Sequence, residues 1–129
     1  MFKYGLDKLT IKTALNIAKG LEKGKITKEA LKNINKSNAA VLAIAQGDKV
    51  VYGINTGFGP LCNTKIPKKD TSQLQRNLLL SHSVGVGNLV DPFIAKLMLI
   101  LKVHSLAKGY SGISIKIIER MLWLSLIHI

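Results

Sequence analysis

The chain has 129 residues, of which 47% are hydrophobic, and its formal net charge is +12. This length is enough for one domain with a buried core, and the composition excludes a disordered polymer. The single cysteine, Cys62, excludes an internal disulfide and a cysteine metal cluster, and it favours a reducing, cytoplasmic location.

Membrane insertion is not expected from the sequence. The N-terminus has no apolar signal-peptide core behind its first lysine. The longest apolar stretch, residues 93–107, is interrupted by Lys96, Lys102 and His104. It is shorter than the roughly 20 apolar residues that a membrane span needs. We therefore expect a soluble protein.

Two amphipathic helices are predicted in the first part of the chain. The first begins at the N-cap candidate Thr10 and ends at Gly20, where glycine stops a helix. The second follows the N-cap candidate Thr27 and carries an apolar stripe to Gln46. The polar run at residues 35–38 predicts an interruption of this helix. Both helices are expected to form a packed pair.

A glycine-rich loop occupies the middle of the chain. Val50–Tyr52 is the only convincing strand seed, and Gly53, Gly57 and Gly59 follow it within seven residues. Glycines at this density favour a tight, pliable loop over regular structure. A third helix is then predicted from its N-cap candidate Asp70 to about His82.

Two more helices are predicted near the C-terminus. Asp91 and Pro92 form a good helix start, and residues 93–108 are apolar on nearly all sides. Such a helix is expected to be buried on several faces, which implies a partner chain or missing sequence. Ser114 or a neighbour is expected to cap the last helix, residues 115–123.

The positive charge raises the alternative of a small nucleic-acid-binding module. Clustered lysines bind nucleic acid by releasing counterions. Here the lysines are scattered between Lys3 and Lys116, with only Lys68 and Lys69 adjacent. The chain has no interleaved aromatic pattern, helix-turn-helix or zinc spacing. We therefore interpret the lysines as solvated helix faces. The alternative predicts DNA affinity that falls steeply with salt.

Tyr52 and His82 are the two residues best placed for chemistry. An ordinary phenol has a pKa near ~10, so a tyrosine acts as a base only when its anion is stabilised. A glycine loop could bring such a phenol onto a substrate and exclude water. The structural alternatives are a tyrosine packed at a strand end and a helix-end histidine without a catalytic role. Composition alone favours these alternatives.

The two motifs around Tyr52 and His82 favour the catalytic interpretation over the structural one. Tyr52–Gly59 reads YGINTGFG, and Leu74–Gly87 reads LQRNLLLSHSVGVG. Both resemble the aromatic amino-acid ammonia-lyases, and they are most similar to the histidine ammonia-lyase branch. The resemblance extends from about Leu9 to Trp123. It implies a mainly α fold, the N-terminal part of the aspartase-like helical ammonia-lyase fold, with a short strand and a glycine-rich loop.

The resemblance also implies roles for individual residues. Tyr52 would be the base that takes a proton from the carbon next to the one bearing nitrogen. His82 would contact the polar ring of the substrate, with Asn55 as a second substrate-binding residue that also orients the loop. The remaining members of the loop are Gly53, Thr56, Gly57, Phe58 and Gly59. No metal-ligating residues are expected.

The family's electrophile is a methylidene-imidazolone (MIO), which forms from an internal Ala-Ser-Gly and adds the substrate amine. The 129 residues contain no Ala-Ser-Gly. We therefore expect residues 1–123 to be the N-terminal portion of a lyase domain, inactive alone, and residues 124–129 to be an artefactual tail.

The implied reaction is elimination of ammonia from L-histidine to give trans-urocanate, in a cytoplasmic homotetramer. Tyrosine ammonia-lyases also have a histidine at this position, and aminomutases share the tyrosine loop, so both remain alternatives. A non-catalytic remnant that assembles with intact lyase chains is another.

Overall fold

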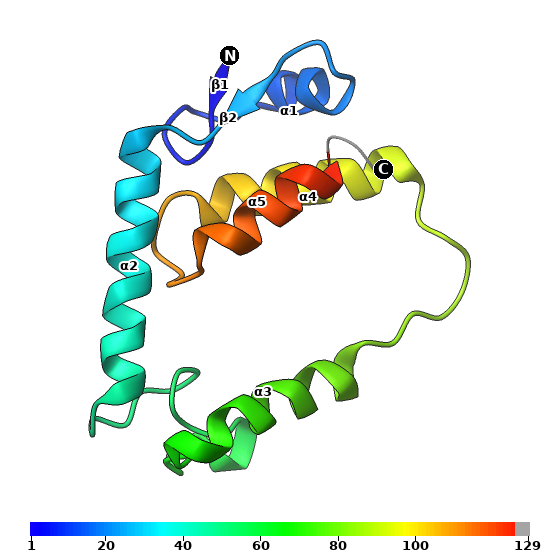
Figure 1. Ribbon diagram of the computed structural model, residues 1–129. Helices are drawn as coiled ribbons and strands as arrows, with labels where there is room; N and C mark the ends of the chain where they lie inside the picture. The colour runs from blue at the N-terminus through cyan, green and yellow to red at the C-terminus, as the bar shows by residue number, and fades with distance from the viewer. Residues whose placement is uncertain (126–129) are drawn as a thin grey trace. The chain divides into compact units, whose positions relative to one another are not determined.

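The computed structural model describes residues 1–125, without the side chain of Lys68, and it is mainly helical, as predicted. Within these residues the order of elements is β1 (Phe2–Lys3), α1 (Ile11–Ala18), β2 (Gly24–Lys25), α2 (Lys28–Gln46), the 3₁₀ turn η1 (Gly59–Leu61), α3 (Lys68–His82), α4 (Pro92–Leu106) and α5 (Ile115–Trp123) (Figure 1). No helix of this part of the chain is long and apolar enough to cross a membrane.

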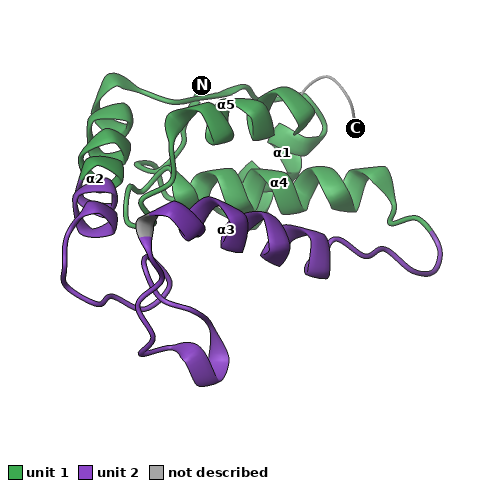
Figure 2. Cartoon of the chain, turned by 60° about the horizontal axis from the view of Figure 1, so that its bottom comes forward, with its two compact units in different colours: residues 1–39, 89–129 green, residues 40–88 purple. Residues whose placement is uncertain are grey.

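The chain divides into two compact units, which Figure 2 shows in two colours. Unit 1 comprises Met1–Ala39 and Leu89–Ile129, and unit 2 comprises Ala40–Asn88. Unit 1 contains the hydrophobic core. Unit 2 contains the glycine-rich loop and α3, and it carries both of the residues singled out above for chemistry.

The core of unit 1 joins segments from both ends of the sequence. β1 and β2 pair in parallel, with Phe2 opposite Gly24, and the Phe2 amide donates to the Lys23 carbonyl at 2.8 Å. α4 and α5 run side by side in opposite directions (Figure 1). The buried cluster of this unit, to which α1 and α2 also contribute, consists of Phe2, Tyr4, Ile17, Ala18, Ile34, Ile100, Val103, Ala107 and Ile118. Burial of this apolar surface is the main stabilising term of the unit.

Four predicted helix signals are confirmed by the structure. The Thr10 hydroxyl accepts from the Thr13 amide at 3.1 Å, and the Thr27 hydroxyl accepts from the Ala30 amide at 3.2 Å. The Asp91 carboxylate accepts from the Phe93 amide at 2.8 Å. Each of these bonds satisfies an amide that has no partner inside the helix. Gly20 follows α1 with a φ of 74°, as expected of a helix-ending glycine.

The predicted interruption of α2 at residues 35–38 is wrong, because α2 is continuous from Lys28 to Gln46. The polar side chains in that run have distant partners. The Asn38 amide donates to the Gly112 carbonyl at 2.7 Å, and the Gly112 amide donates to the Ser37 hydroxyl at 2.9 Å. These residues therefore hold the loop between α4 and α5 against α2 and do not break the helix.

Within this chain α4 is buried on one side only, so burial of its other faces by a partner chain or by further sequence stays a prediction. Ile100, Val103 and His104 are buried on one side of the helix. Ile94, Met98 and Leu101 follow each other at helical spacing on another side and are exposed. Residues from α1 and α4, among them Leu15 and Leu97, line an apolar pocket of about 280 Å³ beside this face. One face of α4 is therefore buried in unit 1 and another face is exposed.

His104 is a satisfied core histidine, as predicted. Its Nδ1 accepts from the Gly5 amide at 3.2 Å, and its ring lies 5.4 Å from that of Phe2. Burial lowers the pKa of His104, the nearby Lys108 lowers it further, and Asp7 opposes the shift. Burial in the core of unit 1 therefore disfavours the charged form of this imidazole.

Unit 2 departs from the sequence predictions at two points. Val50–Tyr52 is not a strand, and the two short strands found within residues 1–125 are β1 and β2. α3 begins at Lys68, with Pro67 as its N-cap and no side-chain capping bond. Asp70 therefore lies inside the first turn, where a carboxylate complements the helix dipole, and it is not the cap.

Candidate functional site

Tyr52 occupies the corner of a tight turn. The Val51 carbonyl accepts from the Ile54 amide at 3.1 Å and from the Asn55 amide at 3.3 Å. Gly53 has a φ of 78°, which the third position of a type II turn requires and which other residues rarely adopt. This turn replaces the predicted strand. It leaves Tyr52 63% exposed to solvent.

Asn55 is the buried centre of this loop, with 3% of its surface exposed. Its Oδ1 accepts from the Val51 amide at 2.8 Å. Its Nδ2 donates to the Lys49 carbonyl at 2.8 Å and to the Ile44 carbonyl at 3.4 Å. Both polar atoms of the side chain are therefore engaged by backbone at and before the first residue of the turn. The role that this geometry supports is orientation of the loop that carries Tyr52.

A short antiparallel contact closes the base of the loop. Thr56 pairs with Lys65, the Gly57 amide donates to the Thr64 carbonyl at 3.1 Å, and the Ile66 amide donates to the Asn55 carbonyl at 2.9 Å. Thr56 is buried, and its hydroxyl is 3.3 Å from the Gly53 amide and 2.9 Å from the Gly57 carbonyl. The loop is therefore held by its own backbone at both ends.

The other loop residues have distinct local roles. The Phe58 ring lies edge-on to Tyr52, with 6.2 Å between the ring centroids. A Cβ on Gly57 would lie 2.6 Å from the Cβ of Leu61, so only glycine fits there. Gly59 has a φ of 58° and starts η1. Cys62 is a free thiol whose amide closes that turn on Gly59.

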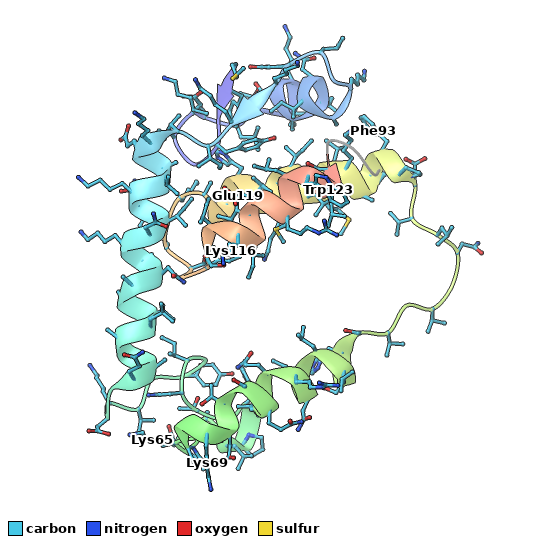
Figure 3. The ribbon with its side chains drawn as sticks, viewed as in Figure 1. Lys65, Lys69, Phe93, Lys116, Glu119 and Trp123 are labelled. Carbon is cyan, nitrogen blue, oxygen red and sulfur yellow. The ribbon has the colours of Figure 1, made fainter. Side chains whose placement is uncertain are left out.

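The Lys65 ammonium connects the loop to the end of α2. It lies 2.9 Å from the Asp48 carboxylate and 3.4 Å from the Asp48 carbonyl. Figure 3 shows Lys65 near the same end of α3 as Lys69. Because both partners of the ion pair are exposed, we assign it little stability.

His82 is the last residue of α3 and is exposed. Its Nδ1 lies 2.9 Å from the Ser81 hydroxyl and 2.9 Å from the Leu78 carbonyl. Ser81 belongs to the second motif, Leu74–Gly87, but no role of its own was predicted for it. The available signal was its place in the last turn of a helix, where a serine hydroxyl can bond the carbonyl three residues earlier.

Tyr52 and His82 lie in the same unit, but the chain does not bring them into contact. No hydrogen bond or ring contact joins them within residues 1–125. The Tyr52 loop is attached just before α3, and a 15-residue helix such as α3 is roughly 22 Å long. Within the described residues the two side chains therefore do not form a common site. The described residues hold no group of three or more metal-ligating side chains.

Comparison with known proteins agrees with both motifs. Residues 9–128 match the family described as aromatic amino acid lyase. The chain is 40% identical over 117 residues to the histidine ammonia-lyase of Photobacterium profundum, covering 91% of this chain and 23% of the relative. It therefore spans about a quarter of the length of that protein. The family match extends past Trp123 to residue 128. The prediction that residues 124–129 are an artefactual tail stays a prediction, since residues 126–129 lie outside the described part of the chain.

Solved structures give the same assignment. The tyrosine aminomutase of Streptomyces globisporus superposes with a TM-score of 0.87 at 27% identity, covering 99% of this chain and 24% of that one. The histidine ammonia-lyase of Trypanosoma cruzi superposes with a TM-score of 0.79 at 34% identity, covering 96% of this chain and 24% of that one. The sequence match over nearly the whole chain, together with these superpositions, establishes that the chain belongs to the aromatic amino acid lyase family.

Proposed function

We propose that this chain supplies the base and a substrate-ring contact of a histidine ammonia-lyase, which eliminates ammonia from L-histidine to give trans-urocanate. The observation that carries the proposal is the turn at Val51–Ile54, which presents Tyr52 while buried Asn55 satisfies the backbone beneath it. A relative named histidine ammonia-lyase is 40% identical over 91% of the chain. Tyrosine aminomutase is a more distant likeness, at 27% identity.

The phenol of Tyr52 would take the proton from the carbon next to the one bearing the amine. General-base catalysis of this kind contributes about 10²- to 10⁴-fold to a rate. A base must reach the substrate in a defined direction, and the hydrogen bonds of Asn55 and Thr56 restrict the loop that carries it. Phe58 would pack beside the phenol as the site closes. In this proposal Asn55 acts mainly by orienting the loop.

The MIO group cannot come from the residues of this chain. The chain contains no Ala-Ser-Gly, so it does not fit the role of MIO donor, and we derive no step through the group. In the proposal, the electrophile belongs to the part of a lyase that this chain does not match. The chain alone would then form no urocanate. A cytoplasmic homotetramer remains part of the proposal and rests on the family resemblance.

The test is a chimera in which this chain replaces the matched quarter of the Photobacterium profundum enzyme, assayed for urocanate. We expect activity with L-histidine, and Tyr52→Phe should lower kcat by at least about 100-fold, the loss of a general base. Tyr110→Phe is the matched control, because Tyr110 is 90% exposed and lies in unit 1, and it should change kcat little.

Three results would count against the proposal. If Tyr52→Phe kept normal turnover, Tyr52 would not be the base. Deamination of L-tyrosine in preference to L-histidine would move the assignment to tyrosine ammonia-lyase. Formation of a β-amino acid would indicate an aminomutase.

A further inference from the structure

The last turn of α3 contains a compact group of three polar atoms. The Ser81 hydroxyl donates to the Leu78 carbonyl at 2.9 Å. The Nδ1 of His82 lies 2.9 Å from that same carbonyl oxygen and 2.9 Å from the Ser81 hydroxyl oxygen. All three atoms are therefore within hydrogen-bond distance of one another.

Counting donors in this group determines which ring nitrogen carries the proton. The Leu78 carbonyl oxygen can only accept, and the Ser81 hydroxyl has one hydrogen, which it directs at that oxygen. If Nδ1 were unprotonated, its lone pair would face the carbonyl lone pairs at 2.9 Å, which is repulsive. If Nδ1 carries the proton, it donates to both the carbonyl and the serine oxygen, and every contact is favourable.

We infer that Ser81 is a positioning residue which, with the Leu78 carbonyl, holds His82 as the Nδ1–H tautomer and presents its Nε2 lone pair as a hydrogen-bond acceptor. In a neutral imidazole one nitrogen donates and the other accepts, so fixing Nδ1 also fixes the function of Nε2. His82 is exposed, and Nε2 is the nitrogen left for a ligand.

The other histidine of the described chain has the opposite arrangement. His104 accepts at Nδ1 from the Gly5 amide at 3.2 Å, which requires the proton on Nε2 when the ring is neutral. The two histidines thus differ in tautomer because one faces a carbonyl and the other an amide. His104 is an internal reference for any measurement on His82.

The consequence concerns the class of substrate and rests on the proposed function. An acceptor nitrogen recognises a ring that carries an N–H or O–H donor, such as imidazole or phenol. A plain phenyl ring would leave Nε2 without a partner, and a site built for a polar contact rejects an analogue that lacks it. Ser81 would therefore contribute to substrate choice through His82, without touching the substrate.

The test is ¹⁵N NMR of the histidine rings in the 129-residue chain at about pH 8, above the ordinary histidine pKa of ~6.5. Protonated and unprotonated ring nitrogens have distinct ¹⁵N shifts, and His82→Gln assigns the His82 signals. We expect a protonated Nδ1 at His82 and a protonated Nε2 at His104. Ser81→Ala should lower the ratio of Nδ1–H to Nε2–H at His82 about fivefold, the effect of losing one net hydrogen bond.

Two further variants keep the result interpretable. Ser81→Thr retains the hydroxyl and should restore the wild-type ratio, because threonine can also bond back to a helix carbonyl. Ser83→Ala removes the flanking serine, whose hydroxyl has no hydrogen bond among the described residues, and should leave the ratio unchanged. In the active chimera, Ser81→Ala should raise KM for L-histidine about fivefold with little change in kcat.

The inference is wrong if His82 shows a protonated Nε2 or an equal mixture of tautomers. It is also wrong if Ser81→Ala and Ser83→Ala have the same effect on the ratio. The NMR result does not depend on catalysis, so an inactive chimera would count against the proposed function alone. An active chimera with the wrong tautomer would count against the present inference alone.

Discussion

Removal of the Asn55 side chain should open the tyrosine loop without unfolding the hydrophobic core. The perturbation is Asn55→Ala. It deletes two short hydrogen bonds, to the Val51 amide and the Lys49 carbonyl, both at 2.8 Å, and a long one at 3.4 Å to the Ile44 carbonyl. Each short bond contributes about 1 kcal/mol net, and the long one less. We expect a loss of about 2–3 kcal/mol in the local free energy of opening.

Hydrogen exchange measures this local free energy directly. The reporter is the Ile66 amide, which donates to the backbone carbonyl of Asn55 at 2.9 Å and so closes the loop without involving the deleted side chain. A loss of about 2–3 kcal/mol corresponds to exchange roughly 30- to 150-fold faster, since each ~1.4 kcal/mol is tenfold. The Phe2 amide, which is bonded in unit 1, should exchange at an unchanged rate.

Asn63→Ala is the matched control for this experiment. Asn63 lies in the same loop, is exposed, and its side chain has no hydrogen bond within the described residues. An exposed substitution of this kind changes stability by less than about 0.5 kcal/mol. The reasoning is refuted if the Ile66 amide is equally protected in Asn55→Ala and wild type, or if Asn63→Ala accelerates its exchange as much.

Three further predictions concern unit 1. In chemical denaturation, Gly109→Ala should destabilise the chain by about 1–3 kcal/mol more than Gly20→Ala. Both glycines have a positive φ (78° and 74°), but only a Cβ at Gly109 would meet backbone, at 2.7 Å. Equal losses of stability would contradict this prediction. Ile100→Ala should lower the free energy of unfolding by about 2–5 kcal/mol, since Ile100 is 1% exposed, and a loss below about 1 kcal/mol would argue against the core described here. Burial lowers the pKa of His104, so its contribution to stability should be complete above the ordinary pKa of ~6.5 and be lost as the pH falls through the lower folded-state pKa. In thermal unfolding between pH 4 and 8, the stability of His104→Asn should therefore depend less on pH than that of the wild type. An unchanged pH profile would refute the lowered pKa of His104.

Local signals accounted for most of the helix ends. Thr10, Thr27 and Asp91 cap their helices through bonds to amides two or three residues away, so the few residues around each cap contain the whole interaction. α3 was placed correctly as a helix, but its start was misjudged, because Pro67 precedes it and Asp70 has no capping bond. The interruption predicted for α2 was wrong for a different reason, because Ser37 and Asn38 bond to Gly112, which is distant in sequence.

In the candidate site, too, some features could be predicted from the sequence and others could not. Tyr52, His82 and the loop glycines could be named from the two motifs, because family membership is carried by short sequence runs. Asn55 was predicted to orient the loop, but its partners could not be named, since they are the Lys49 and Ile44 carbonyls, whose positions depend on how α2 ends. The contact of Ser81 with Nδ1 likewise depends on the rotamers that the helix end allows.

The sequence by itself determined the family, the mainly helical class and three of the helix caps, because these depend on residue identity and on contacts within one turn. Only the tertiary structure decided that α2 is continuous, through bonds of Ser37 and Asn38 to Gly112. It also decided that Phe2–Lys3 pairs with Gly24–Lys25. The physical reason is that a polar side chain or an unpaired strand can satisfy its hydrogen bonds with any partner that folding brings close, and sequence spacing does not specify which one.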